Sequence, residues 1–80
     1  MEAVRAKLSK YTKAIYVLSR DEGEYTITVI EQSTLDGKTS VYSAPKITPD
    51  KKIARRIFKK ICKGKVFGET LSDVIYNLLC

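Results

Sequence analysis

The stretch 48-TPDKKIARRIFKKICKG-64 decides the fold, because its apolar residues recur at helical spacing: Ile53, Ala54, Ile57, Phe58 and Ile61. Thr48 suits the N-cap, Pro49 the first helical position and Asp50 the positive end of the helix dipole. Gly64 supplies a left-handed stop. The pattern predicts a helix over about residues 49–63.

A second helix is predicted at about 70–79. Thr70 and Asp73 have the spacing of a capping box. The apolar residues behind them fall on one helical face, namely Leu71, Val74, Ile75, Leu78 and Leu79. The connection 64–68 is short, so we expect the two helices to pack as neighbours through their apolar faces.

Strands precede the helices. Residues 24–32 alternate between apolar and polar side chains, and residues 38–44 return as a second strand after the Asp36–Gly37 pair, which favours a two-residue type I′ turn. That turn would pair Val29 with Ala44 and Glu31 with Tyr42. It places one set of side chains on a common face, as a floor for the helices: Tyr25, Ile27, Val29, Tyr42 and Ala44.

The first twenty residues support two interpretations. One amphipathic helix would align five residues, Val4, Leu8, Tyr11, Ile15 and Leu18. However, 13-KAIYVLS-19 is rich in β-formers, and 20-RDEG-23 resembles a hairpin turn into the next strand. We favour a strand at about 13–19, preceded by a loose or helical segment over residues 1–11.

Together these elements predict one small α+β domain over residues 1–80. Its antiparallel sheet would have two to three strands, at about 13–19, 24–32 and 38–44, with two C-terminal helices, at about 49–63 and 70–79, on one face. A chain of 80 residues has one core and little room for a deep cavity.

This layout resembles a domain-of-unknown-function family of small uncharacterised proteins from clostridial-type bacteria. The segments that carry the resemblance are YTITVI (25–30), ITPDKKIARRIFKKI (47–61) and TLSDVIYNLL (70–79). The chain departs from the family pattern in its far more basic first helix and in lacking acids near its C-terminus. The family has no known activity, so the resemblance implies a fold and no reaction.

Catalytic and metal-binding chemistry has little support in the sequence. The chain contains no histidine, and its two cysteines cannot complete a four-ligand zinc site. We interpret Cys62 as a small core residue and Cys80 as an exposed thiol, both reduced in the cytoplasm. The acids at 21–24 surround a turn glycine, where solvated acids are common. We therefore expect no enzyme activity, no cofactor and no metal.

Positive charge is concentrated in one segment. Residues 1–45 hold six bases and six acids, whereas residues 46–65 hold nine bases and only Asp50 as an acid. Four like-charge pairs at i,i+4 within the helix would cost on the order of 1–2 kcal/mol. The residues that we expect to bind an anionic partner are Lys51, Lys52, Arg55, Arg56, Lys59, Lys60, Lys63 and Lys65.

Three classes of partner follow from this charge. We favour a non-enzymatic binding or regulatory module that presents the basic helix to an acidic protein partner. The alternative is a nucleic-acid-binding protein that contacts the phosphate backbone through the same helix, with strongly salt-dependent affinity. Binding to an anionic membrane is disfavoured, because the apolar face of the helix is buried in the core and cannot insert into the lipid. Two copies could also form a homodimer through the free face of the sheet.

Overall fold

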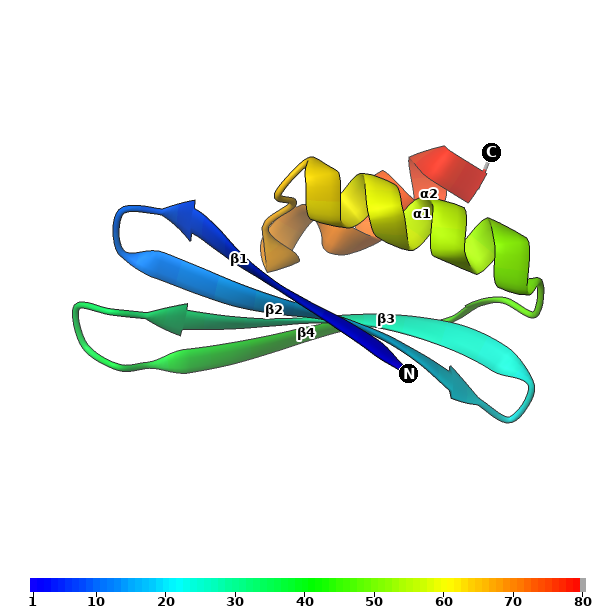
Figure 1. Cartoon of the computed structure of the whole chain (residues 1–80), viewed down its shortest axis with the longest axis horizontal. Helices are drawn as coiled ribbons and strands as arrows, with labels where there is room; N and C mark the ends of the chain where they lie inside the picture. The colour runs from blue at the N-terminus through cyan, green and yellow to red at the C-terminus, as the bar shows by residue number, and fades with distance from the viewer. Residues whose placement is uncertain (80) are drawn as a thin grey trace.

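Four antiparallel strands followed by helices form the chain in the computed structural model, which describes residues 1–79. Strands β1 (Glu2–Ser9), β2 (Thr12–Asp21), β3 (Glu24–Ser33) and β4 (Thr39–Thr48) lie in chain order in one sheet. Helix α1 (Lys51–Lys63), the 3₁₀ turn η1 (Gly68–Thr70) and helix α2 (Leu71–Leu79) cover one face of this sheet (Figure 1). The predicted α+β class is confirmed, but the sheet has four strands rather than two or three.

The additional strand is β1, so the prediction of a loose or helical segment over residues 1–11 is wrong. β1 pairs with β2 in a register that sets Val4 opposite Tyr16 and Ala6 opposite Ala14. Residues four apart share a face in a strand as well as in a helix, so the spacing of Val4 and Leu8 fits both structures. The β-rich run in β2 decides between them, because it supplies the neighbour with which β1 pairs.

The type I′ turn lies in a different hairpin from the one predicted. Glu22 and Gly23 connect β2 to β3, and both have positive φ, 52° and 82°, as a type I′ turn requires. Between β3 and β4 the loop spans residues 34–38 instead, and a hydrogen bond from Ser33 N to Lys38 O at 2.9 Å closes it. Only Gly37 has positive φ there, at 73°.

The longer loop changes the pairing of β3 with β4. Val29 lies opposite Tyr42 and Glu31 opposite Ser40, so the predicted partners Ala44 and Tyr42 are each wrong by two positions. Side chains alternate with period two, and a slip of two residues leaves every side chain on its predicted face. The face prediction is therefore confirmed although the register prediction is not.

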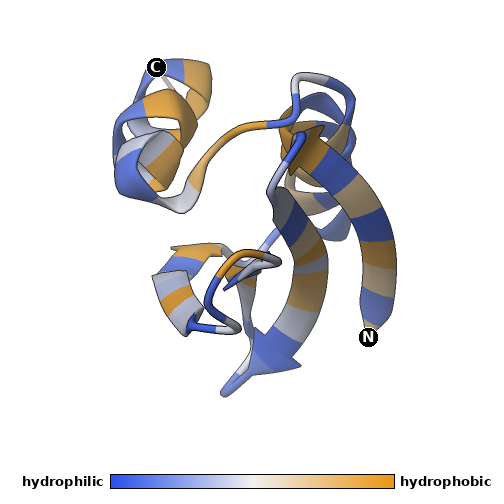
Figure 2. Cartoon of the chain, turned by 90° about the vertical axis from the view of Figure 1, so that its left-hand side faces the viewer, coloured by the Kyte–Doolittle hydropathy of each residue, from blue (hydrophilic) through white to orange (hydrophobic). Residues whose placement is uncertain are grey.

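The core lies between the inner face of the sheet and the two helices. Tyr16, Ile27 and Val29 contribute fully buried side chains from the sheet, and Ile57, Ile61 and Leu71 contribute them from the helices. Hydrophilic and hydrophobic residues alternate along the strands (Figure 2), as expected for a sheet with one covered face. Within residues 1–79, the outer face of the sheet carries no helix (Figure 1).

Helix α1 ends at Lys63 as predicted, but it begins two residues later than predicted, and the left-handed residue after it is displaced by one. The N-cap is Asp50 rather than Thr48: its carboxylate accepts from the backbone N–H of Lys52 at 2.8 Å and of Ile53 at 3.1 Å. At the other end Gly64 is right-handed, and Lys65 takes the left-handed conformation with φ 49°.

The C-terminal geometry of α1 is a Schellman motif with lysine at the left-handed position. Val66 N–H donates to Ile61 O at 3.3 Å, and Lys65 N–H donates to Cys62 O at 3.2 Å. These bonds satisfy carbonyl groups at the end of the helix and direct the chain from α1 into the connection that leads to α2.

The entry to α2 is fixed by contacts that the capping-box prediction does not contain. The Thr70 hydroxyl donates to the Phe67 carbonyl at 3.2 Å, at the start of the helical segment. Gly68 is buried against Tyr42 of β4, and its N–H donates to a carboxylate oxygen of Glu31 on β3. η1 is thereby attached to the inner face of the sheet.

Candidate binding surface

The candidate surface is the outward side of α1. Its other side supplies four buried residues to the core, Ala54, Ile57, Phe58 and Ile61. Because a helix turns 100° per residue, fixing these side chains inward fixes the residues between them outward. All eight basic residues predicted as binding residues are exposed: Lys51, Lys52, Arg55, Arg56, Lys59, Lys60, Lys63 and Lys65. We call this set the α1 basic surface.

Four of these cations converge. Lys52, Arg55, Arg56 and Lys59 line one shallow, open depression of about 380 Å³. They come from two successive turns of the helix, where residues three and four apart are neighbours. A carboxylate or phosphate placed there would meet several positive charges at once.

One carboxylate of the chain already contacts this surface. Arg55 Nη2 lies 3.0 Å from Oε1 of Glu2, at the start of β1, and both side chains are about half exposed. An exposed pair of this kind contributes roughly 0–1 kcal/mol. The contact relieves part of the like-charge repulsion along α1 and leaves Arg56 and Lys59 for other anions.

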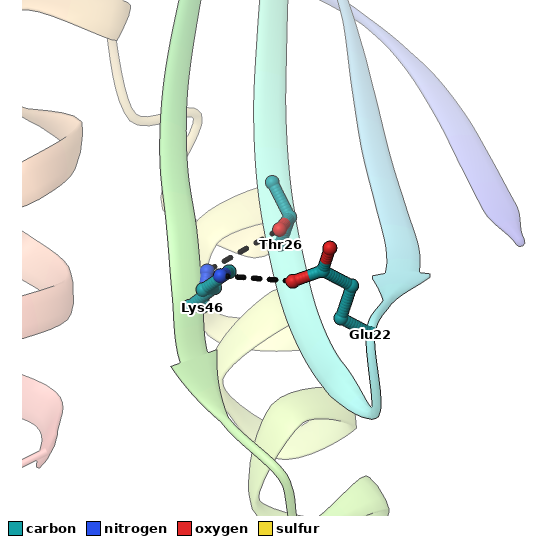
Figure 3. A network of polar contacts seen from close by, with 3 residues as sticks. All are labelled: Glu22, Thr26 and Lys46. Atoms are coloured by element: carbon teal, nitrogen blue, oxygen red, sulfur yellow. Dashed lines mark hydrogen bonds and ion pairs between the residues drawn. The ribbon is translucent and has the colours of Figure 1, made fainter.

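Lys46, which precedes the helix, belongs to a different contact. Its Nζ lies 3.1 Å from Glu22 Oε2, and its backbone N–H donates to Thr26 Oγ1 at 3.3 Å (Figure 3). Lys46 has positive φ, 51°, where the pairing of β3 with β4 becomes irregular. Its charge is therefore directed to the β2–β3 turn rather than to the α1 basic surface.

Two titratable groups face the core near α1: Tyr16 on β2, beneath the helix, and Cys62 on the helix itself. The Tyr16 side chain is fully buried and its hydroxyl donates to Val66 O at 2.8 Å. Burial, with smaller contributions from Cys62 and Glu31, raises the pKa of Tyr16 to about 12. Burial and then the charge of Glu2 raise the pKa of the Cys62 thiol. Both groups are neutral at pH 7, which suits structural positions better than nucleophilic ones.

The remaining tyrosines divide between core and surface. Tyr25 and Tyr42 are half-buried against the core, whereas Tyr11 and Tyr76 are exposed. The Lys10 ammonium makes a cation–π contact with the Tyr11 ring, its Nζ lying 5.4 Å from the ring centroid. None of the four comes from α1, and the fully buried Tyr16 is not available to flank a binding surface.

The sequence prediction of the site did not include the outer face of β1. Arg5 and Lys7 project there beside Lys13 of β2, and with Ile15 and Ile30 they border a shallow concavity of about 600 Å³. The sequence contains a signal for this second cationic group, because Arg5 and Lys7 are two residues apart. That spacing puts them on one face only if residues 2–9 form a strand.

Metal ligands do not gather in this structure: across residues 1–79, no group of three or more His, Cys, Asp or Glu side chains is placed to hold an ion. Cys80, predicted as an exposed thiol, lies outside the described residues. Within the same range, neither helix combines the length and the apolar character that a membrane crossing requires.

Comparison with known proteins adds no relative. No protein-family model, no curated protein and no solved structure matches the chain. The resemblance to the bacterial family of unknown function therefore stays a hypothesis, and the functional argument rests on the residues of this chain.

Proposed function

We propose that this protein is a small, non-enzymatic binding or regulatory module of the cytoplasm that presents the α1 basic surface to an acidic protein partner. The observation that carries the proposal is that α1 exposes seven basic side chains and has no acid among its own residues 51–63. Like charges at i,i+4 destabilise a helix, so the arrangement disfavours the free protein and favours a complex with an anion.

A carboxylate partner is favoured by the contact between Arg55 and Glu2. That contact shows that a carboxylate on an extended strand reaches the guanidinium from the β1 side of the helix. Arg56 and Lys59 line the same depression as Arg55 and are available to bind a second carboxylate. Charge complementarity of this kind speeds encounter and selects against basic partners.

The alternative function is binding of a nucleic-acid backbone. The depression lined by four cations favours it, because several donors around one recess suit a phosphate as well as a carboxylate. Backbone contacts made in this way carry little sequence information and release counterions, so affinity would fall steeply with salt.

A binding titration separates the two functions. Fluorescence anisotropy would compare a labelled Glu-rich peptide, a single-stranded RNA and a duplex DNA at several salt concentrations. The test variant is Arg56→Gln with Lys59→Gln, which leaves the Arg55–Glu2 ion pair in place. The matched control is Lys10→Gln with Lys38→Gln, at exposed positions in hairpin connections, which removes the same charge.

Binding of the peptide, weakened about tenfold in the α1 variant and unchanged in the control, supports the proposed function; tenfold corresponds to two exposed ion pairs of about 0.7 kcal/mol each. Binding of RNA or DNA with the same variant dependence, and no binding of the peptide, would replace it with the alternative function. Equal binding by both variants would remove the α1 basic surface from either function.

A further inference from the structure

An open strand edge borders the α1 basic surface. Within residues 1–79, β1 is the terminal strand of the sheet and pairs only with β2. Its pairing is regular over six consecutive residues, Glu2–Lys7 against Lys13–Leu18. In such a strand alternate N–H and C=O groups point away from the sheet, where they can pair with another strand.

Cations border this edge on both faces of the sheet. Arg5 and Lys7 are exposed on the outer face. On the helical side, Arg55 reaches Glu2 of β1, so the positive side of α1 lies above the same edge. A strand added beside β1 would place side chains directly opposite Arg5 and Lys7, with Cβ atoms about 5 Å apart.

The helical side of β1 also leaves apolar surface in solvent. Val4 points to that side, opposite Tyr16 in the β1–β2 pairing, yet its residue is 40% exposed. Leu8, at the other end of the strand, packs only partly against the core. An added strand could cover both residues with the apolar side chains at its own alternate positions.

We propose that an extended acidic segment of the partner protein adds to β1 as a fifth strand. Its carboxylates lie opposite Arg5 and Lys7, and its intervening apolar side chains cover Val4. The proposal rests on the function proposed above and specifies how the partner attracted by α1 is held: through backbone hydrogen bonds, in a mode known as β-augmentation.

The charges argue against a second copy of this chain at the same edge. With the helices of both copies on the same side of the joined sheet, the two antiparallel registers that pair the most residues of β1 with a second copy are centred on Arg5 and on Ala6; the first puts Arg5 opposite Arg5, and the second puts Arg5 opposite Lys7. Like charges directly opposite each other are destabilising. The other sheet edge offers no such selection, because β4 is uncharged over Thr39–Ala44 and Pro45 then removes a backbone donor.

The test uses a labelled peptide of seven residues with alternating Glu and Val. A second peptide has the same sequence but carries a methyl group on every internal amide nitrogen, so that it keeps the charge and loses the strand donors. Binding is measured by anisotropy at low salt. Amide hydrogen exchange of the full chain, with and without peptide, then locates the bound segment.

We expect the methylated peptide to bind at least tenfold more weakly, about the effect of losing two or more net hydrogen bonds. Arg5→Gln with Lys7→Gln should weaken binding of the unmodified peptide about fivefold, as expected for two cross-strand ion pairs. The matched control, Lys10→Gln with Lys38→Gln, should remain within twofold. Exchange should slow in Glu2–Ser9 and not in Thr39–Ala44.

Equal binding of both peptides, still dependent on Arg56 and Lys59, would overturn the strand addition and leave the proposed function standing. Slowed exchange confined to β4 would also overturn the addition to β1. If neither peptide binds at low salt, both the strand addition and the acidic partner are refuted.

Discussion

The hydroxyl of Tyr16 supports a specific prediction about stability. This buried group donates to the Val66 carbonyl at 2.8 Å and so ties β2 to the segment that follows α1. Tyr16→Phe keeps the ring and leaves the carbonyl without that donor, which costs about 1–2 kcal/mol. For a domain of this size we expect the Tm to fall by about 5–15 °C.

The pH dependence of this effect has a definite sign. The pKa of Tyr16 is raised from 10.0 to about 12 in the folded protein. Between these values the unfolded chain has lost the Tyr16 proton while the folded chain keeps it, so rising pH favours unfolding. Two pKa units correspond to about 2–3 kcal/mol. The advantage of the wild type over Tyr16→Phe should therefore be full below pH 10 and absent by about pH 12.

Urea denaturation at pH 8, 9, 10, 11 and 12 measures this difference, with Tyr11→Phe as the matched control, because the Tyr11 side chain is exposed. Effects common to all variants, such as lysine titration, cancel in the comparison. A difference between wild type and Tyr16→Phe that stays constant from pH 8 to 12 would refute the buried position of this hydroxyl.

Three further substitutions test the packing and the chain geometry. Gly68→Ala should cost about 2–3 kcal/mol, because a Cβ atom would lie 2.6 Å from Cε2 of Tyr42, and Tyr42→Ala should relieve much of that cost in a double-mutant cycle of urea midpoints. Lys65→Gly should raise the free energy of unfolding by about 1 kcal/mol, because φ at this position is 49° and glycine adopts this conformation without strain. Lys65→Ala removes the same positive charge but should not stabilise the protein. A gain in stability from both variants would show that the lost charge, rather than the backbone conformation, is the cause. In a chain carrying Cys80→Ser, Cys62 should react with iodoacetamide at pH 8 at least about tenfold more slowly than free cysteine, since burial raises its pKa; an equal rate would contradict the packing of Cys62.

The helices were the most predictable part of the fold, because several independent signals coincide in them. In α1 the apolar spacing agrees with the start signals at residues 48–50, and only the cap and the left-handed residue shift, from Thr48 to Asp50 and from Gly64 to Lys65. Left-handed residues are usually glycine, so a lysine at that position is not visible in the sequence.

The sheet was less predictable, because strand pairing depends on partners far along the chain. Two sites offered a hairpin turn, and Glu22–Gly23 takes the type I′ form although Asp36–Gly37 has the stronger sequence preference for it. β1 escaped prediction since its apolar residues are few and its partner β2 decides its structure. The contact of Gly68 with Tyr42 and Glu31 joins segments that no local pattern connects.

The candidate surface was predictable in composition and less so in extent. A run of cations between inward apolar residues is enough to place the eight basic residues outward on and beside α1. The ion pair of Arg55 with Glu2 and the cations of β1 required the fold, because they bring the first residues of the chain to the side of the helix.

The most direct test of the central claim is an NMR titration of the isotope-labelled protein with the Glu-rich peptide. Side-chain and backbone resonances of Lys52, Arg55, Arg56 and Lys59 should shift most, saturate together, and return when salt is raised. Shifts confined to α2 or to the β3–β4 loop, with these four residues unmoved, would contradict the assignment of α1 as the binding surface.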